Sequence, residues 1–287
     1  MILRLGRRAF AETDLVLMAI VNRTPDSFYD RGATYAADAA LAAVDEAVAG
    51  GADIVDIGGV KAGHGPPVPP AEEIRRVAGT VAAVRDRHPD LVVSVDTWRS
   101  EVARVVIEAG ADLVNDSWAG VDPALAEVAG AAGVGLVCSH AGGLAPRTRP
   151  HRVAYRDVVA DVLAGVTGLA DRAVSLGVPR ESVLIDPTHD FGKNTWHSLQ
   201  LTRRLPELVA TGWPVLVAAS NKDFIGETLD LPVGERLEGT LATLAVSAWL
   251  GARVFRVHQV RPARRALDMV AAIRGTRPPA ATRRGLA

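Results

Sequence analysis

The feature that most constrains the fold is an alternation of two patterns along nearly the whole chain. Short runs rich in β-branched residues alternate with alanine-rich stretches whose apolar residues recur at helical spacing. Strands that alternate with helices, and that are apolar throughout, predict a parallel sheet covered on both faces. The strand-like runs are residues 15–22, 53–59, 91–97, 112–118, 135–140, 183–188, 214–220 and 253–258. The clearest helical stretches are residues 36–51, 71–88, 100–110 and 237–251.

Glycine marks several corners between a helical stretch and the strand that follows it. Gly51 and Gly110 each precede Ala-Asp at the start of a strand, and Gly251 precedes Ala-Arg in the same place. Glycine at a helix end favours a left-handed turn. The reuse of this corner indicates a repeated βα unit.

The number of βα units favours one closed barrel. Roughly eight units can be counted, which is the number that closes a TIM barrel. A doubly wound open sheet is the alternative, but it usually needs fewer strands, and no Gly-x-Gly-x-x-Gly follows the first strand. The predicted fold is therefore an α/β TIM (β/α)8 barrel, a single domain over residues 1–275. Residues 276–287 are rich in Pro and Arg and are expected to form a flexible tail.

Composition excludes several classes of protein. The formal net charge is -1 and the sequence pI is about 6.7, so no basic field would attract nucleic acid or an anionic membrane. The longest apolar runs are far shorter than the roughly 20 residues of a membrane span, and the first residues do not resemble a signal peptide. A single cysteine, Cys138, excludes an internal disulfide framework. We expect a soluble, cytoplasmic protein.

Polar residues end nearly every predicted strand. The active site of a TIM barrel lies at the carboxyl ends of its strands. One polar residue there is most simply a capping group, but capping does not explain so many together, since buried polar groups are costly unless they are satisfied. The residues are Asn22, Asp56, Asp96, Asn115, Asp116, His140, Asp186, Ser220, Lys222, Arg256 and His258.

The mixture of side chains indicates the kind of ligand. Carboxylates and amides can hydrogen-bond a flat heterocycle that carries both donors and acceptors, while the basic residues add positive charge on one side. This suits a neutral aromatic ring joined to an anion such as phosphate. No Ser-His-Asp set and no zinc-type histidine spacing stands out. The residues in question are Asp96, Asn115 and Asp186 for the heterocycle, and Lys222, Arg256 and His258 for the charge.

Eight short motifs in this order resemble those of the dihydropteroate synthase family. They are NRTPDSF, GADIVDIGG, VSVDT, GADLVND, the segment around His140, IDP with FGK, SNK and RVH. The resemblance implies a TIM barrel that joins p-aminobenzoate to 6-hydroxymethyl-dihydropterin pyrophosphate, with Mg²⁺. It also implies a homodimer.

The resemblance assigns roles to particular residues. It implies that Asn22 is the Mg²⁺ ligand and also contacts substrate, with residues 24–27 folding over the site. Asp96, Lys222 and Arg256 are the predicted catalytic residues. The implied pterin ligands are Asp96, Asn115, Asp186 and Lys222; the implied pyrophosphate ligands are Arg256 and His258; and Phe191 is expected to wall the acceptor pocket.

Departures from the family pattern lie mainly where p-aminobenzoate is expected to bind. The family usually reads GGESTRPG after the second strand, whereas residues 58–65 read GGVKAGHG, so the Glu, Ser, Thr and Arg of that loop are missing. Ser-Arg-Lys becomes Ser-Asn-Lys, with Asn221 in place of Arg. Gly-x-Gly-Phe-Gly-Lys becomes THDFGK over residues 188–193, which puts Asp190 beside Phe191. Arg23 and Gln259 depart from Asn-Val-Thr and Arg-Val-His-Asp.

These departures favour a divergent paralogue that keeps the pterin site while condensation with p-aminobenzoate is weak or lost. Such a protein is expected to bind sulfonamide or sulfone mimics of the acceptor at most weakly. Two other interpretations stay open, a fully active synthase and a reduced-folate methyl-transfer module. The basic residues at the last two strands argue against the methyl-transfer module, which needs no pyrophosphate site.

Overall fold

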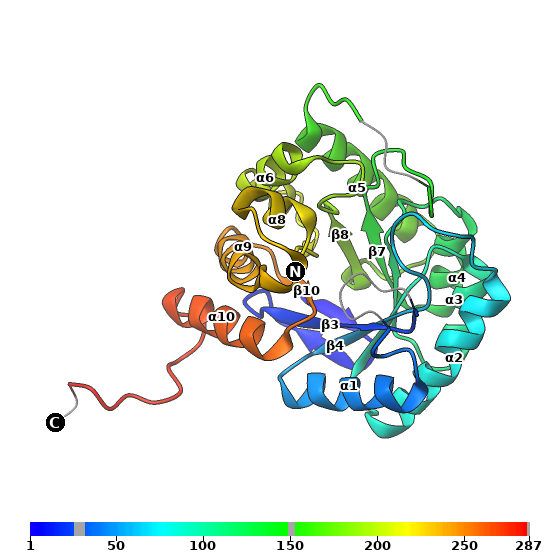
Figure 1. Ribbon diagram of the computed structural model, residues 1–287, viewed down its shortest axis with the longest axis horizontal. Helices are drawn as coiled ribbons and strands as arrows, with labels where there is room; N and C mark the ends of the chain where they lie inside the picture. The colour runs from blue at the N-terminus through cyan, green and yellow to red at the C-terminus, as the bar shows by residue number, and fades with distance from the viewer. Residues whose placement is uncertain (26–31, 149–152, 286–287) are drawn as a thin grey trace.

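Eight parallel strands form a closed barrel in the computed structural model, which describes residues 1–25, 32–148 and 153–285 (Figure 1). The strand order is β8-β7-β6-β5-β4-β3-β10-β9. A parallel bridge between Ile185 and Val215 joins the two strands at the ends of this order and closes the ring. The barrel strands are β3 (Val16–Asn22), β4 (Ile54–Gly58), β5 (Val92–Asp96), β6 (Leu113–Asp116), β7 (Gly135–Ser139), β8 (Val183–Asp186), β9 (Leu216–Val217) and β10 (Val254–Val257). The predicted TIM barrel is confirmed.

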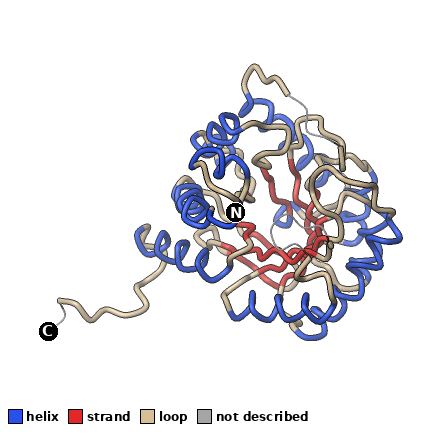
Figure 2. The backbone as a smooth tube through the Cα atoms, viewed as in Figure 1, coloured by secondary structure: helices blue, strands red, loops and turns tan. Residues whose placement is uncertain are grey.

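Helices surround the strands on the outside of the barrel (Figure 2). Each buries an apolar stripe against the sheet, as the helical spacing of the sequence predicts. The helices are α1 (Ala37–Ala49), α2 (Pro70–Arg87), α3 (Ser100–Glu108), α4 (Ala124–Ala132), α5 (Val158–Ser175), α6 (Thr195–Arg203), α7 (Leu205–Val209), α8 (Asp223–Leu229), α9 (Leu237–Trp249) and α10 (Val260–Ile273). No helix in the described ranges is long and apolar enough to cross a membrane.

The corner glycines adopt the predicted left-handed conformation. Gly51, Gly110 and Gly251 have φ of 93°, 109° and 107°. After α10 the chain forms no further helix or strand up to residue 285 and extends away from the barrel (Figure 1). The flexibility of this segment stays a prediction.

An N-terminal hairpin that the sequence did not reveal closes the bottom of the barrel. Strands β1 (Leu3–Leu5) and β2 (Arg8–Phe10) pair antiparallel. Their buried side chains Leu3, Leu5 and Phe10 join the apolar cluster inside the barrel. The amino-terminal end of the barrel is therefore a packed core.

Alternation along each strand explains why the apolar strands end in polar residues. Val16 and Met18 point into the barrel with the inner cluster, whereas Leu17 and Ala19 join the outer core beneath the helices. Because side chains alternate with a period of two, the inward row of β3 continues to Asn22. Steps of two residues along other strands likewise connect an inward apolar side chain with an inward polar one. These pairs are Ile54 and Asp56, Val92 and Asp96, Leu113 and Asn115, and Val254 and Arg256. The barrel interior is thus apolar below and polar at the carboxyl ends of its strands.

Candidate functional site

A cavity of about 350 Å³ opens at the carboxyl ends of the strands. Its size is within the range of small-molecule sites. Seven of the eight predicted site residues line it, namely Asp96, Asn115, Asp186, Phe191, Lys222, Arg256 and His258. The eighth, Asn22, lies at the end of β3 beside Gly58, its partner in β4. Its Oδ1 and the Cβ of Asp96 flank Gly58, so Asn22 borders the cavity wall without lining it.

Asp56 holds the charged side chains together beneath the cavity. Its Oδ2 accepts from Arg256 Nε at 2.6 Å and from Asn115 Nδ2 at 3.0 Å, and its Oδ1 accepts from Ser94 Oγ at 2.6 Å. Asp56 is fully buried. The sequence predicts Asp56 at a strand end, but it assigns Asp56 no role in the site. The available signal was its position two residues before Gly58 in β4, in the inward-facing row of that strand.

Arg256 bridges two carboxylates rather than lying unpaired for an anion. Besides its bond to Asp56, its Nη2 donates to Asp96 Oδ2 at 3.0 Å. Ser117 Oγ donates to the other Asp96 oxygen at 3.0 Å. Burial raises the pKa of Asp96 to about 7, against the lowering effect of Arg256. Burial would lower the pKa of Arg256, but Asp56 and Asp96 raise it overall, so the guanidinium is charged.

His258 does not supply the positive charge that the sequence suggested. Burial, with a contribution from Arg256, lowers the pKa of His258 to about 3, so the ring is neutral at pH 7. Ser220 Oγ lies 3.0 Å from its Nδ1 and accepts from its backbone N–H at 3.2 Å. The charge of an anion bound here would oppose this lowering of the pKa.

Asp186 and Lys222 form the opposite wall with Phe191. Asp186 Oδ1 accepts from the Thr188 backbone N–H at 2.7 Å. Lys222 Nζ donates to the His189 carbonyl and lies 5.0 Å from the centre of the Phe191 ring. Burial raises the pKa of Asp186 and lowers that of Lys222. Phe191 also packs edge-on against Trp118, with ring centres 5.1 Å apart.

The altered positions border this cavity directly. Lys61, Ala62, Asp190 and Asn221 all line it. Arg147, from the segment after β7, pins the altered loop: its Nη1 donates to the carbonyls of Lys61 at 2.6 Å and Gly63 at 3.1 Å. The loop that departs most from the family pattern is therefore held at the mouth of the site.

Asp190 and Thr188 occupy positions where the family has glycine, and both keep a backbone conformation that favours glycine. Their φ values are 70° and 53°. Contacts hold this backbone in place. Asp190 accepts from the Phe224 N–H at 3.2 Å and from Ser198 Oγ at 3.1 Å, while Thr188 Oγ1 accepts from the His140 N–H at 3.1 Å.

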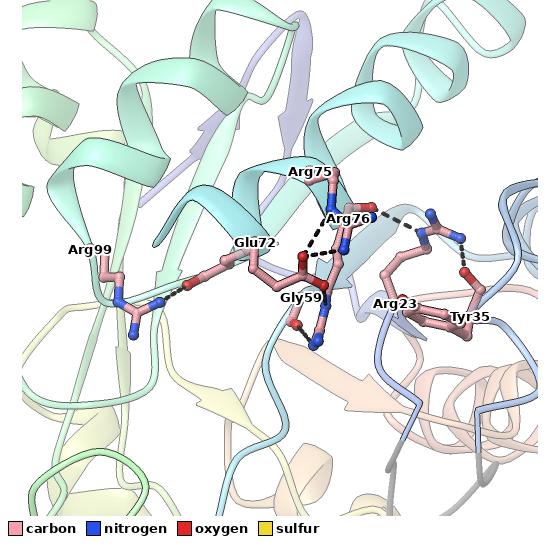
Figure 3. Close-up of polar contacts among 8 residues, drawn as sticks. Arg23, Tyr35, Gly59, Glu72, Arg75, Arg76 and Arg99 are labelled. Atoms are coloured by element: carbon pink, nitrogen blue, oxygen red, sulfur yellow. Dashed lines mark hydrogen bonds and ion pairs between the residues drawn. The ribbon is translucent and has the colours of Figure 1, made fainter. Parts of the chain in front are cut away.

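Arg23 contacts backbone near α2 rather than the cavity. Figure 3 shows its side chain between the carbonyl of Arg76, which accepts from Nε at 3.0 Å, and that of Tyr35. Arg76 in turn donates to the Gly59 carbonyl at 2.9 Å (Figure 3). Arg23 thus helps to fix the start of the altered loop. Residues 26–27 of the loop predicted to fold over the site lie outside the described residues.

A metal cage is not evident in the described part of the chain. No group of three or more His, Cys, Asp or Glu side chains there is arranged to hold a metal ion. Mg²⁺, however, commonly takes one or two protein oxygens and completes its shell with water and substrate phosphates. Among the described residues, the Asn22 amide oxygen beside Gly58 fits that mode of binding.

Comparisons with known proteins agree with this geometry. The family described as "Pterin binding enzyme" matches residues 18–258. A Mycobacterium leprae protein named "Inactive dihydropteroate synthase 2" is 60% identical over 98% of both chains. The dihydropteroate synthase of Haemophilus influenzae is 37% identical over 85% of this chain and 88% of its own. The crystal structure of Yersinia pestis dihydropteroate synthase in a sulfonamide complex has a TM-score of 0.90 and 32% identity, covering 96% of this chain and 100% of that chain.

Proposed function

Because this chain belongs to the pterin-binding enzymes, in the dihydropteroate synthase family, we propose that it binds 6-hydroxymethyl-dihydropterin pyrophosphate but condenses it with p-aminobenzoate weakly or not at all. One observation carries this proposal. Asp96, Asn115 and Arg256 form one connected network around Asp56, while the altered residues Lys61, Ala62, Asp190 and Asn221 line the same cavity. Relatives at 58–60% identity carry the name "inactive".

The polar residues that line this cavity suit a pterin. Asp96 and Asp186 offer carboxylate oxygens to ring N–H groups, and Asn115 offers an amide. Carboxylates in a buried site also stabilise positive charge that develops on the ring and its methylene carbon when pyrophosphate leaves. Arg256, held by Asp56 and Asp96, would stabilise the departing anion from a fixed position. Lys222 would hold the ring from the β9 side, against Phe191.

We propose that the Asn22 amide oxygen would hold Mg²⁺ when the pterin pyrophosphate is bound. The ion would neutralise negative charge on the leaving group. The residues of this chain would then contribute one direct ligand, and the substrate would contribute others.

A homodimer is the proposed assembly. Large apolar side chains are exposed on the packed pair α9 and α10, namely Val246, Trp249, Met269 and Ile273. Analytical ultracentrifugation of the wild type and of Trp249→Glu would test this, with a dimer expected for the wild type and a monomer for the variant. A monomeric wild type would contradict it.

Calorimetric titration with the pterin pyrophosphate in Mg²⁺ tests the proposed function. Saturable binding is expected for the wild type. Asp96→Asn and Asp186→Asn should each weaken it about tenfold or more, because a buried hydrogen-bond partner is lost. Asp14→Asn, a carboxylate at the other end of the barrel, is the matched control. No binding by a folded wild-type protein would overturn the proposal.

A further inference from the structure

Lys193 carries a buried ammonium that donates three hydrogen bonds, all of them to backbone carbonyls. Its Nζ lies 2.8 Å from the His140 oxygen, 3.0 Å from the Thr188 oxygen and 2.8 Å from the Phe191 oxygen. Lys193 is 9% exposed. A lysine has three N–H donors, so every one of them is used within the protein. The side chain therefore links three points of the backbone.

These carbonyls belong to two separate strand-to-helix connections. His140 follows β7, whereas Thr188 and Phe191 follow the neighbouring strand β8. The two connections also touch elsewhere. The His140 N–H donates to Thr188 Oγ1 at 3.1 Å, and a Cβ at Gly192 would lie only 2.5 Å from the Ala141 oxygen. The ammonium thus fastens together two segments that pack closely at the carboxyl ends of their strands.

The backbone of residues 188–193 needs contacts of this kind. Thr188, Asp190 and Gly192 have φ of 53°, 70° and 61°. This left-handed region is unfavourable for Thr and Asp, and most of all for a β-branched residue. Such a conformation persists only when its surroundings hold it. The ammonium bonds the carbonyls of Thr188 and Phe191, on both sides of Asp190, so it opposes relaxation of the strained residues.

The same loop forms one wall of the candidate site. Thr188, Asp190 and Phe191 line the cavity. The His189 carbonyl accepts from Lys222 Nζ, which lies 5.0 Å from the centre of the Phe191 ring. A shift of the loop would therefore move both the Phe191 ring and the acceptor that orients Lys222.

We infer that Lys193 is a positioning residue of this site, whose ammonium holds residues 188–193 in one conformation. That conformation places the Phe191 ring and the His189 carbonyl against Lys222. Lys193 is not among the residues that line the cavity, so it acts through the loop. The hold on the loop is independent of the proposed function, whereas its effect on the binding of pterin pyrophosphate rests on that function.

The charge of this ammonium is maintained against burial. Burial, with a smaller contribution from Lys222, lowers the pKa of Lys193 to about 7, against the raising effect of Asp186, Asp190 and Asp161. Only the protonated form has three donors. Experiments at pH 6 therefore examine the form that holds the loop.

Amide hydrogen exchange at pH 6 tests the hold without any ligand. The backbone N–H groups of Thr188, Asp190 and Phe191 are all hydrogen-bonded, so a peptide that spans them reports opening of the loop. Lys193→Ala should accelerate exchange there about tenfold or more, because three bonds are lost. Exchange in β4 should not change. Lys61→Ala removes another lysine that borders the cavity and is the control, with no effect expected in this loop.

Chemical rescue distinguishes a hold by the ammonium from a general loss of packing. Propylammonium supplies the carbon atoms and the nitrogen that Lys193→Ala removes. It should bring exchange in the loop to within about threefold of the wild-type rate, because it binds only the closed loop. 1-Propanol, a neutral molecule of similar size, should not. In Lys193→Met, whose side chain fills the space, exchange should be accelerated and propylammonium should have no effect.

Three results would overturn the inference. They are unchanged exchange in both variants of Lys193, equal acceleration throughout the barrel, and equal rescue by 1-propanol. Thermal melting checks that each variant folds, and Lys193→Met supplies the exchange comparison if Lys193→Ala does not.

Calorimetric titration with the pterin pyrophosphate measures the effect on the site. Lys193→Met should bind it about tenfold more weakly than the wild type, because Lys222 and Phe191 lose their fixed positions. Unchanged affinity in a variant whose loop exchanges faster would contradict the positioning role. Failure of the wild type to bind would instead overturn the proposed function, and the exchange measurements would still decide whether Lys193 holds the loop.

Discussion

Arg256 on β10 and Asp56 on β4 form an ion pair in which the carboxylate is fully buried and the guanidinium largely so, with Nε donating to Oδ2 at 2.6 Å. The two residues are 200 positions apart, and strand β3 lies between their strands. The pair fixes Arg256 before any ligand arrives, and the same carboxylate orients Asn115. Preorganisation of this kind lowers the cost of binding a polar ligand.

Removing the charge of Asp56 should therefore destabilise the protein. Breaking a buried ion pair from one side costs about 3–5 kcal/mol, so Asp56→Asn is expected to lower the free energy of unfolding by about 3 kcal/mol, since Arg256 keeps Asp96. Urea denaturation measures this. Asp86→Asn, on the exposed face of α2, is the control and should change little. A change of less than 1 kcal/mol in Asp56→Asn would show that the pair contributes no net stability.

The raised pKa of Asp96 predicts how stability depends on pH. Burial raises it from 3.8 to about 7, so the folded protein holds a proton that the unfolded chain releases. The stability from this group is present below pH 4 and is lost as the pH rises toward and through 7. The free energy of unfolding should fall less steeply between pH 4.5 and 7.5 in Asp96→Asn than in the wild type. Parallel curves for the two proteins would contradict this assignment.

The N-terminal hairpin should contribute substantially to stability. Leu5 is 1% exposed and packs in the inner barrel cluster, so Leu5→Ala leaves a cavity. We expect a loss of about 2–4 kcal/mol in the free energy of unfolding. Arg4→Ala, on the exposed face of the same strand, should have little effect. Equal effects of the two substitutions would indicate that the hairpin does not close the barrel in solution.

Asn221 and Gln259 both depart from the family pattern, and they contact each other. Restoring Arg at position 221 alone would bury a cation beside a neutral amide, near Arg236. We predict that Asn221→Arg lowers the free energy of unfolding by about 2 kcal/mol or more. Adding Gln259→Asp should recover at least half of that loss, by pairing the new charge. A double-mutant cycle measures the coupling, and additive effects would show that the two changes are independent.

The barrel could be predicted from the sequence because the spacing of apolar residues distinguishes strands from helices, and their alternation along the chain indicates the βα repeat. The alternation from Val254 to Arg256 by itself places a guanidinium inside the barrel mouth. The pairing of that guanidinium depends on neighbouring strands, however, so the sequence could not show that Arg256 lies between Asp56 and Asp96. The same holds for His258, whose neutrality follows from burial beside Arg256.

Very short strands could not be predicted from the sequence either. Strands β1 and β2 have three residues each, which is too short for a periodic pattern to stand out. Their role depends on the barrel that they close. Asn221 was identified as an altered residue from its motif, but only the packing shows that its Oδ1 has no hydrogen-bond partner among the described residues.

Release of pyrophosphate tests the central claim most directly. The wild-type protein is incubated with 6-hydroxymethyl-dihydropterin pyrophosphate and Mg²⁺, with and without p-aminobenzoate, and binding of the pterin is measured on the same preparation. The account predicts saturable binding of the pterin together with pyrophosphate release that p-aminobenzoate accelerates little or not at all. Turnover with p-aminobenzoate in the usual range of enzymes, about 1 s⁻¹ or faster, would contradict it.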